Sequence, residues 1–140
     1  MREHWLISSS EIQTSPDKVL GHGTYGVVNH GFFHGAPVAV KWSRAELTGG
    51  RVLNVQFANE IRVLRQARHP YIVTFYGGIF DTEGGRSGVV LEYVEGPTLR
   101  EFVLSECANE KTQYDIIVGA TSALMFLHSR DPCIVHGDLK

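Results

Sequence analysis

The pattern of apolar residues changes near Gly96-Pro97, and this change limits the possible fold more than any other feature of the chain. Before it, short β-branched runs alternate with glycine-rich turns, a pattern typical of strands and hairpins. After it, apolar residues recur at helical spacing from about Gln113 to His128. A strand-rich half followed by a helix-rich half predicts an α+β fold with a boundary between residues 94 and 97.

Local patterns define the elements within each half. The runs Val27-Val28 and 38–42 are separated by Gly31, Gly35 and Pro37, which favours a hairpin. Further strands are predicted over 72–80 and 88–93, and helices over 54–68, 99–104 and 113–128.

Composition excludes several classes of function. Apolar content of 43% and charged content of 20% are ordinary for a soluble globular protein. A formal charge of −2 gives no reason to expect a nucleic-acid partner. The longest uncharged apolar-leaning run, 116–127, is too short for membrane insertion. No apolar segment follows the first five residues, so we expect no secretory signal. Cys107 and Cys133 lack the spacing of metal ligands, so we expect reduced thiols in a cytoplasmic protein with no metal site among these residues.

A glycine-rich segment, Gly21-His22-Gly23-Thr24-Tyr25-Gly26, lies in the strand-rich half. Glycines let the backbone approach a phosphate closely and leave amide N–H groups to point at it. The same spacing occurs in dinucleotide-binding folds and in plain turns, so the pattern alone leaves these uses open. A dinucleotide fingerprint needs a helix directly after the third glycine. Here Val27-Val28 and a turn follow, which favours a flap between two strands.

Lys41 and Glu60 are predicted to form an ion pair. Alternation places Lys41 with Ala39 on one face of its strand, beneath the glycine segment and within reach of phosphates. Isolated strand lysines and helix glutamates are usually solvated. Glu60, in contrast, lies between Phe57 and Leu64 on the apolar face of its helix, where a carboxylate is costly unless it is paired. We therefore expect Lys41 to be its partner.

In order and in spacing, these features resemble the N-terminal half of a eukaryotic protein kinase, from about Leu20 to Lys140. The resemblance rests on the following segments: the glycine loop (Gly21, Gly23, Gly26 and Val28), Val38-Ala39-Val40-Lys41, the helix residue Glu60, a hinge at Val90-Leu91-Glu92-Tyr93-Val94, and Leu127-His128 followed by His136-Gly137-Asp138-Leu139-Lys140. It implies a protein-kinase-like α+β fold, with an antiparallel five-stranded N-lobe and its C-helix followed by a truncated helical C-lobe. Residues 1–16 would be an extension, 17–94 the N-lobe and hinge, and 95–140 an incomplete C-lobe.

The resemblance also implies binding of ATP. The residues implied to contact the nucleotide are Leu20, Gly21, Gly23, Thr24, Tyr25, Gly26, Val28, Ala39, Lys41, Leu91, Glu92 and Val94. Within this set, the glycine segment would cover the phosphates and Lys41 would hold the α- and β-phosphates. Leu91 would be the gatekeeper, and the backbone of Glu92 and Val94 would hydrogen-bond the adenine edge.

Four residues are implied to be catalytic. Glu60 would position Lys41. Asp138 would orient the substrate hydroxyl and accept its proton, and Lys140 would neutralise charge on the transferring phosphoryl group. These roles imply a protein substrate that is phosphorylated on Ser or Thr, because a lysine two residues after the catalytic aspartate resembles Ser/Thr kinases. Three segments together resemble the tyrosine-kinase-like group: Trp5-Leu6-Ile7, Ser10-Glu11-Ile12 and His136-Gly137-Asp138.

The sequence departs from the family pattern at two places. Gly137 replaces an arginine that commonly pairs with an activation-loop phosphate, so regulation by that route is in doubt. The loop asparagine and the D-F-G motif, which would hold Mg²⁺, would lie beyond Lys140. We therefore expect a polypeptide of these 140 residues to lack kinase activity.

Two alternative functions stay open. A pseudokinase-type module would hold nucleotide or a partner without transfer, but it has no need of Lys41, Glu60 and Asp138 together. A small-molecule kinase of the same fold shares the H-G-D triplet, whereas the glycine flap and Leu139-Lys140 favour protein substrates.

Overall fold

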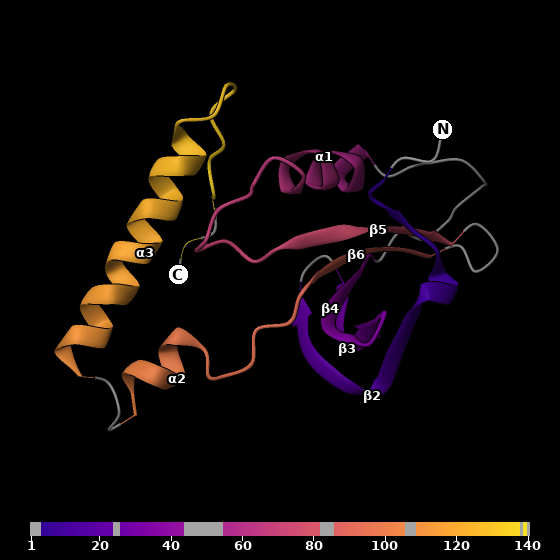
Figure 1. Ribbon diagram of the computed structural model, residues 1–140, viewed down its shortest axis with the longest axis horizontal. Helices are drawn as coiled ribbons and strands as arrows, with labels where there is room; N and C mark the ends of the chain where they lie inside the picture. Colours follow the sequence, from indigo (N-terminus) through magenta and orange to yellow (C-terminus); the bar gives the residue numbers. More distant parts are fainter. Residues whose placement is uncertain are drawn as a thin grey trace. The chain divides into compact units, whose positions relative to one another are not determined.

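The computed structural model describes residues 4–23, 26–43, 55–81, 86–105, 109–137 and 139, and Figure 1 shows its elements. The chain divides into two compact units. The sheet unit comprises Met1–Arg68 and Val73–Tyr93, and the helical unit comprises His69–Ile72 and Val94–Lys140.

A six-stranded sheet forms the sheet unit, in the order β1-β5-β6-β4-β3-β2. Its strands are β1 (Leu6–Ile7), β2 (Ile12–Gly23), β3 (Gly26–Phe33), β4 (Ala36–Ser43), β5 (Phe75–Asp81) and β6 (Arg86–Glu92), and a short 3₁₀ helix, η1 (Ser9–Glu11), joins β1 to β2. All strand pairs are antiparallel except β1 with β5, which is parallel. The α+β kinase-like fold is confirmed, but the predicted five-stranded antiparallel sheet is wrong in one respect, because β1 adds a sixth strand.

The hairpin predicted around Gly35 is present as β3 and β4. His34 and Gly35 form its two-residue turn, with φ values of 48° and 84°. Both values are in the left-handed region, which suits a two-residue hairpin turn and is adopted most readily by glycine. The register pairs Phe33 with Ala36 and continues without a shift to Gly26 and Ser43.

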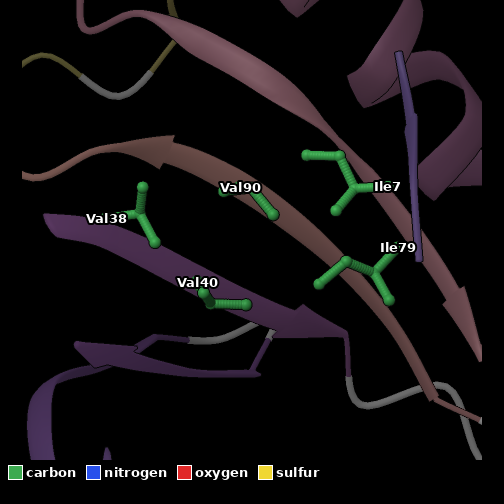
Figure 2. Packing of buried hydrophobic residues seen from close by; sticks show 5 residues of the cluster. All are labelled: Ile7, Val38, Val40, Ile79 and Val90. Atoms are coloured by element: carbon green, nitrogen blue, oxygen red, sulfur yellow. The ribbon is translucent and has the colours of Figure 1, made fainter. Parts of the chain in front are cut away.

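The sheet separates two clusters of buried side chains. The first cluster contains Ile7, Val38, Val40, Ile79 and Val90, which come from β1, β4, β5 and β6. Figure 2 shows these side chains gathered between the strands. The second cluster contains Phe57, Ile61 and Val89 and lies where α1 (Val55–Leu64) packs on the sheet. Figure 1 shows α1 running alongside β5. The helix predicted over 54–68 therefore ends four residues early, at Leu64.

The described part of the helical unit contains two helices. In α2 (Leu99–Val103), Thr98 and Glu101 make a reciprocal capping box. The longer α3 (Glu110–His128) begins three residues before the predicted start, because the side chain of Asn109 accepts a hydrogen bond from the Thr112 N–H and caps it. None of the helices in the described part of the chain has the length and apolar character that a membrane crossing requires.

Candidate active site

The predicted ion pair between β4 and α1 is present. Lys41 Nζ donates a hydrogen bond to Glu60 Oε1 over 2.6 Å. The two side chains are 29% and 34% exposed, so the pair is partly shielded from water and partly accessible to it. Two periodicities place it: alternation along β4 directs Lys41 to the α1 side of the sheet, and helical spacing directs Glu60 toward the sheet.

Strand register brings three of the predicted nucleotide-contacting residues onto the same face as Lys41. Val28 and Val89 are the cross-strand partners of Lys41, and Leu91 is a partner of Ala39. Because side chains alternate along a strand, Val28, Ala39, Lys41 and Leu91 all lie on one face. All four are partly buried. Ala39 adds only a methyl group to this face, between its partners on β3 and β6.

The glycine segment connects two paired strands. Gly23 pairs with Gly26 across the turn, and Gly21 pairs with Val28. A strand therefore follows the third glycine, so the segment is not a dinucleotide fingerprint, which needs a helix there. A Cβ placed on Gly21 would meet no atom within 4 Å, so the face beside it is open. Thr24 and Tyr25 lie outside the described residues.

The end of β6 carries the predicted hinge contacts. The backbone N–H of Glu92 donates to the carbonyl oxygen of Thr74 over 2.8 Å. The backbone N–H of Glu92 is therefore already hydrogen-bonded within the sheet. The predicted contact with adenine would then be made by the backbone carbonyl of Glu92. Leu20 and Val94 are 38% and 63% exposed, and Val94 belongs to the helical unit. The nucleotide contacts of these residues stay predictions.

His30 is an unanticipated feature of the nucleotide face. It is the cross-strand partner of Ala39 and is only 6% exposed. Its ring lies nearly perpendicular to those of Phe32 and Tyr93, with centroids 5.1 and 4.8 Å away. Its Nδ1 atom is buried and has no hydrogen-bond partner. Alternation places His30 on the Lys41 face, but it could not show that Tyr93 would cover the ring.

The catalytic-loop segment is described only in part. Asp138 and Lys140 lie outside the described residues, and Leu139 is 65% exposed. Gly137 has a φ of 72°, in the left-handed region. An arginine at this position would be strained, which gives a backbone reason for the glycine. Within the described ranges, no group of three or more His, Cys, Asp or Glu residues is arranged to hold a metal ion.

Comparison with known proteins decides the family. Residues 14–140 match the family model of the protein kinase domain. The chain belongs to this family. The serine/threonine-protein kinase VIK of Arabidopsis thaliana is 28% identical over 97% of the chain and 31% of its own length. The serine/threonine-protein kinase CTR1 of the same plant is 30% identical over 86% of the chain and 15% of its own length.

A third relative is named for a U-box domain and not for a kinase. The U-box domain-containing protein 70 of Oryza sativa subsp. japonica is 31% identical over 98% of the chain and 17% of its own length. The chain therefore spans less than a third of the length of these relatives. Family membership predicted from the motifs is confirmed, and Ser/Thr kinases are among the chain's relatives.

Proposed function

We propose that this kinase domain binds ATP and belongs to an enzyme that phosphorylates Ser or Thr in protein substrates. The ion pair between Lys41 and Glu60 carries the proposal. It puts a cation, already oriented by a carboxylate, on the same face as Val28 and Ala39. An oriented cation beside apolar side chains suits a ligand with a flat base and a chain of phosphates.

Each residue then has a part in the chemistry. Lys41 holds the α- and β-phosphates, and Glu60 fixes the position of its ammonium group. Asp138 accepts the proton of the substrate hydroxyl, and Lys140 offsets charge on the transferring phosphoryl group. Mg²⁺, when bound, would offset the negative charge of the phosphates. The described residues contain no group of three or more His, Cys, Asp or Glu side chains that could hold it.

A polypeptide limited to these 140 residues should bind nucleotide without transferring phosphate. It contains neither the asparagine expected at position 143 nor a D-F-G motif after Lys140. In protein kinases, these two elements hold the Mg²⁺ ions. Incubation with ATP and a general protein substrate should leave the substrate unphosphorylated. Transfer that disappears in Asp138→Asn would contradict this expectation.

Nucleotide binding is the direct test of the proposal. Titration with a fluorescent ATP analogue should give saturable binding that excess ATP reverses. Lys41→Met should weaken the affinity about tenfold, as expected when one charge-assisted phosphate contact is lost. Lys111→Met is the matched control, because Lys111 is an exposed lysine on α3 and should leave the affinity unchanged. Absence of saturable binding, or equal effects of the two substitutions, would overturn the proposal.

A further inference from the structure

Trp5 lies at the edge of the sheet unit, before the part of the chain that matches the kinase family. The family match begins at residue 14. The carbonyl oxygen of Trp5 accepts a hydrogen bond of 2.8 Å from the N–H of Gly78. Directly after it, Leu6 and Ile7 pair with Gly78 and Ile79, and Ile7 is only 6% exposed. Backbone bonds and a buried side chain therefore fix the position of Trp5 on β5.

The indole ring of Trp5 packs against the cluster that contains the buried face of α1. It contacts Phe80 in an edge-to-face arrangement with centroids 5.9 Å apart. Phe80 contacts Phe57 of α1 in the same way, at 5.2 Å. At the other end of the helix, the Arg65 guanidinium lies over the indole, 5.3 Å from its centroid. Trp5 therefore supports α1 through Phe80 near the helix start and through Arg65 just beyond its end.

Trp5 and Ile61 also share the space above one glycine. A Cβ on Gly78 would lie 2.8 Å from Ile61 Cδ1 and 3.3 Å from Trp5 Cζ3. The indole of Trp5 and the side chain of Ile61 therefore both pack over Gly78, where β5 has no side chain. Ile61 is 3% exposed and follows Glu60 directly in the helix. Any movement of Ile61 into space vacated by Trp5 would carry Glu60 with it.

Packing must set the position of α1, because the helix is only ten residues long. Isolated helices of this length are marginal in water. The hydrogen bond from Lys41 to Glu60 spans 2.6 Å, and a displacement of about 1 Å would take it past the usual limit for such bonds. A small shift of α1 is therefore enough to open the ion pair without unfolding the sheet.

We infer that Trp5 is a positioning residue for the Lys41–Glu60 ion pair. Trp5 acts through α1. The segment that precedes the family match at residue 14 therefore helps to keep the ion pair closed. The consequence for nucleotide affinity rests on the proposed function, whereas the effect on the ion pair does not. Removing the indole should lower the fraction of molecules in which the pair is closed.

Zero-length cross-linking measures this fraction directly. A carbodiimide activates the Glu60 carboxylate, and the Lys41 amine then displaces the activating group to form an amide bond with net loss of one water. Mass spectrometry of the digested 140-residue protein quantifies the joined peptides. Trp5→Ala should reduce the yield about fivefold, which corresponds to a coupling of about 1 kcal/mol. Trp5→Phe keeps an aromatic ring against Phe80 and should give most of the wild-type cross-linking yield.

Two further variants separate positioning from stability. Trp5→Leu keeps an apolar side chain in the site and provides a folded variant if Trp5→Ala unfolds; it should also lower the yield. Phe33→Leu is the control, because Phe33 packs with the first cluster, away from α1. It should lower thermal stability and leave the yield unchanged. Equal cross-linking in wild type and Trp5→Leu, or an equal loss in Phe33→Leu, would overturn the inference.

Nucleotide titration of the same variants distinguishes the two proposals. If the cross-link falls in Trp5→Leu and wild type binds no nucleotide, the positioning role stands and the proposed function fails. If wild type binds nucleotide and Trp5→Leu has wild-type cross-linking, the proposed function stands and the positioning role fails. Both proposals predict a parallel loss of cross-linking and affinity.

Discussion

Glu92 Oε2 accepts two hydrogen bonds from Thr74, one from its backbone N–H over 3.0 Å and one from its hydroxyl over 2.8 Å. The backbone N–H first, and the hydroxyl second, lower the pKa of the Glu92 carboxyl below its ordinary value. Because the backbone N–H of Glu92 also donates to the Thr74 carbonyl, the two residues tie the start of β5 to the end of β6. These hydrogen bonds fix the backbone of Glu92, which is predicted to contact adenine.

This relationship predicts a pH-dependent effect of Thr74→Val. A carboxyl whose pKa is lower in the folded state stabilises the fold above its unfolded pKa, and the contribution is lost as the pH falls through the folded pKa. Urea unfolding at neutral pH should show a loss of at most about 1 kcal/mol in Thr74→Val, since only the hydroxyl bond is removed. The loss should shrink in acid. Thr74→Ser keeps the hydroxyl and should match wild type, and a pH-independent loss would contradict the assignment.

The buried imidazole of His30 predicts a stabilising substitution. Its Nδ1 atom has no hydrogen-bond partner, and such a buried polar atom has lost its hydration without compensation. His30→Phe keeps an aromatic ring between Phe32 and Tyr93 and removes the unpaired nitrogen. The unfolding free energy should rise by about 1 kcal/mol in urea denaturation. His4→Phe, at an exposed position, should have little effect, and destabilisation by His30→Phe would show that the nitrogen is satisfied in solution.

The ion pair was predictable because two local periodicities determine it. Strand alternation gave the face of Lys41, and helical spacing gave the face of Glu60. In contrast, β1 is two residues long and has no readable period, and its partners on β5 are distant in sequence. The burial of His30 likewise depends on Tyr93, which directly follows β6 and is distant from His30 in sequence. Local patterns therefore predicted the site's central pair, and contacts between distant segments account for what they missed.

The close approach of β1 to β5 predicts that Gly77→Ala is destabilising. A Cβ on Gly77 would collide with the Trp5 carbonyl oxygen and lie 2.8 Å from Ile7 Cγ1. Backbone cannot yield as a flexible side chain does, so β1 would have to move, at a cost of about 1–3 kcal/mol in unfolding free energy. Hydrogen exchange at the Gly78 amide should accelerate. Gly21→Ala is the control for stability, since its Cβ meets no atom within 4 Å, and equal stability of the two variants would contradict the packing.

A double-mutant cycle should measure the coupling between Lys41 and Glu60. Both side chains are about one-third exposed, so solvent screens their attraction. Urea unfolding of Lys41→Met, Glu60→Gln and the double variant should give a coupling of about 0.5–1 kcal/mol. Repeating the cycle in about 1 M salt should reduce it, because the screening length falls to about 3 Å. A coupling near zero at low salt would mean that the pair is open in solution.

A hydrogen bond between His69 and Ser122 predicts a loss of stability confined to the helical unit. The N–H of Tyr71 donates to His69 Nδ1 over 3.2 Å, so Nδ1 is the acceptor and the ring proton lies on Nε2. Nε2 then donates to Ser122 Oγ, also 3.2 Å away, and joins the 69–72 segment to α3. Ser122→Ala should lower the unfolding free energy by about 1 kcal/mol, and nitrogen NMR of the imidazole should show the Nε2-protonated tautomer in wild type. Thr121→Ala, at the neighbouring exposed position, should leave stability within about 0.5 kcal/mol of wild type. The opposite tautomer, or equal effects of the two substitutions, would contradict this arrangement.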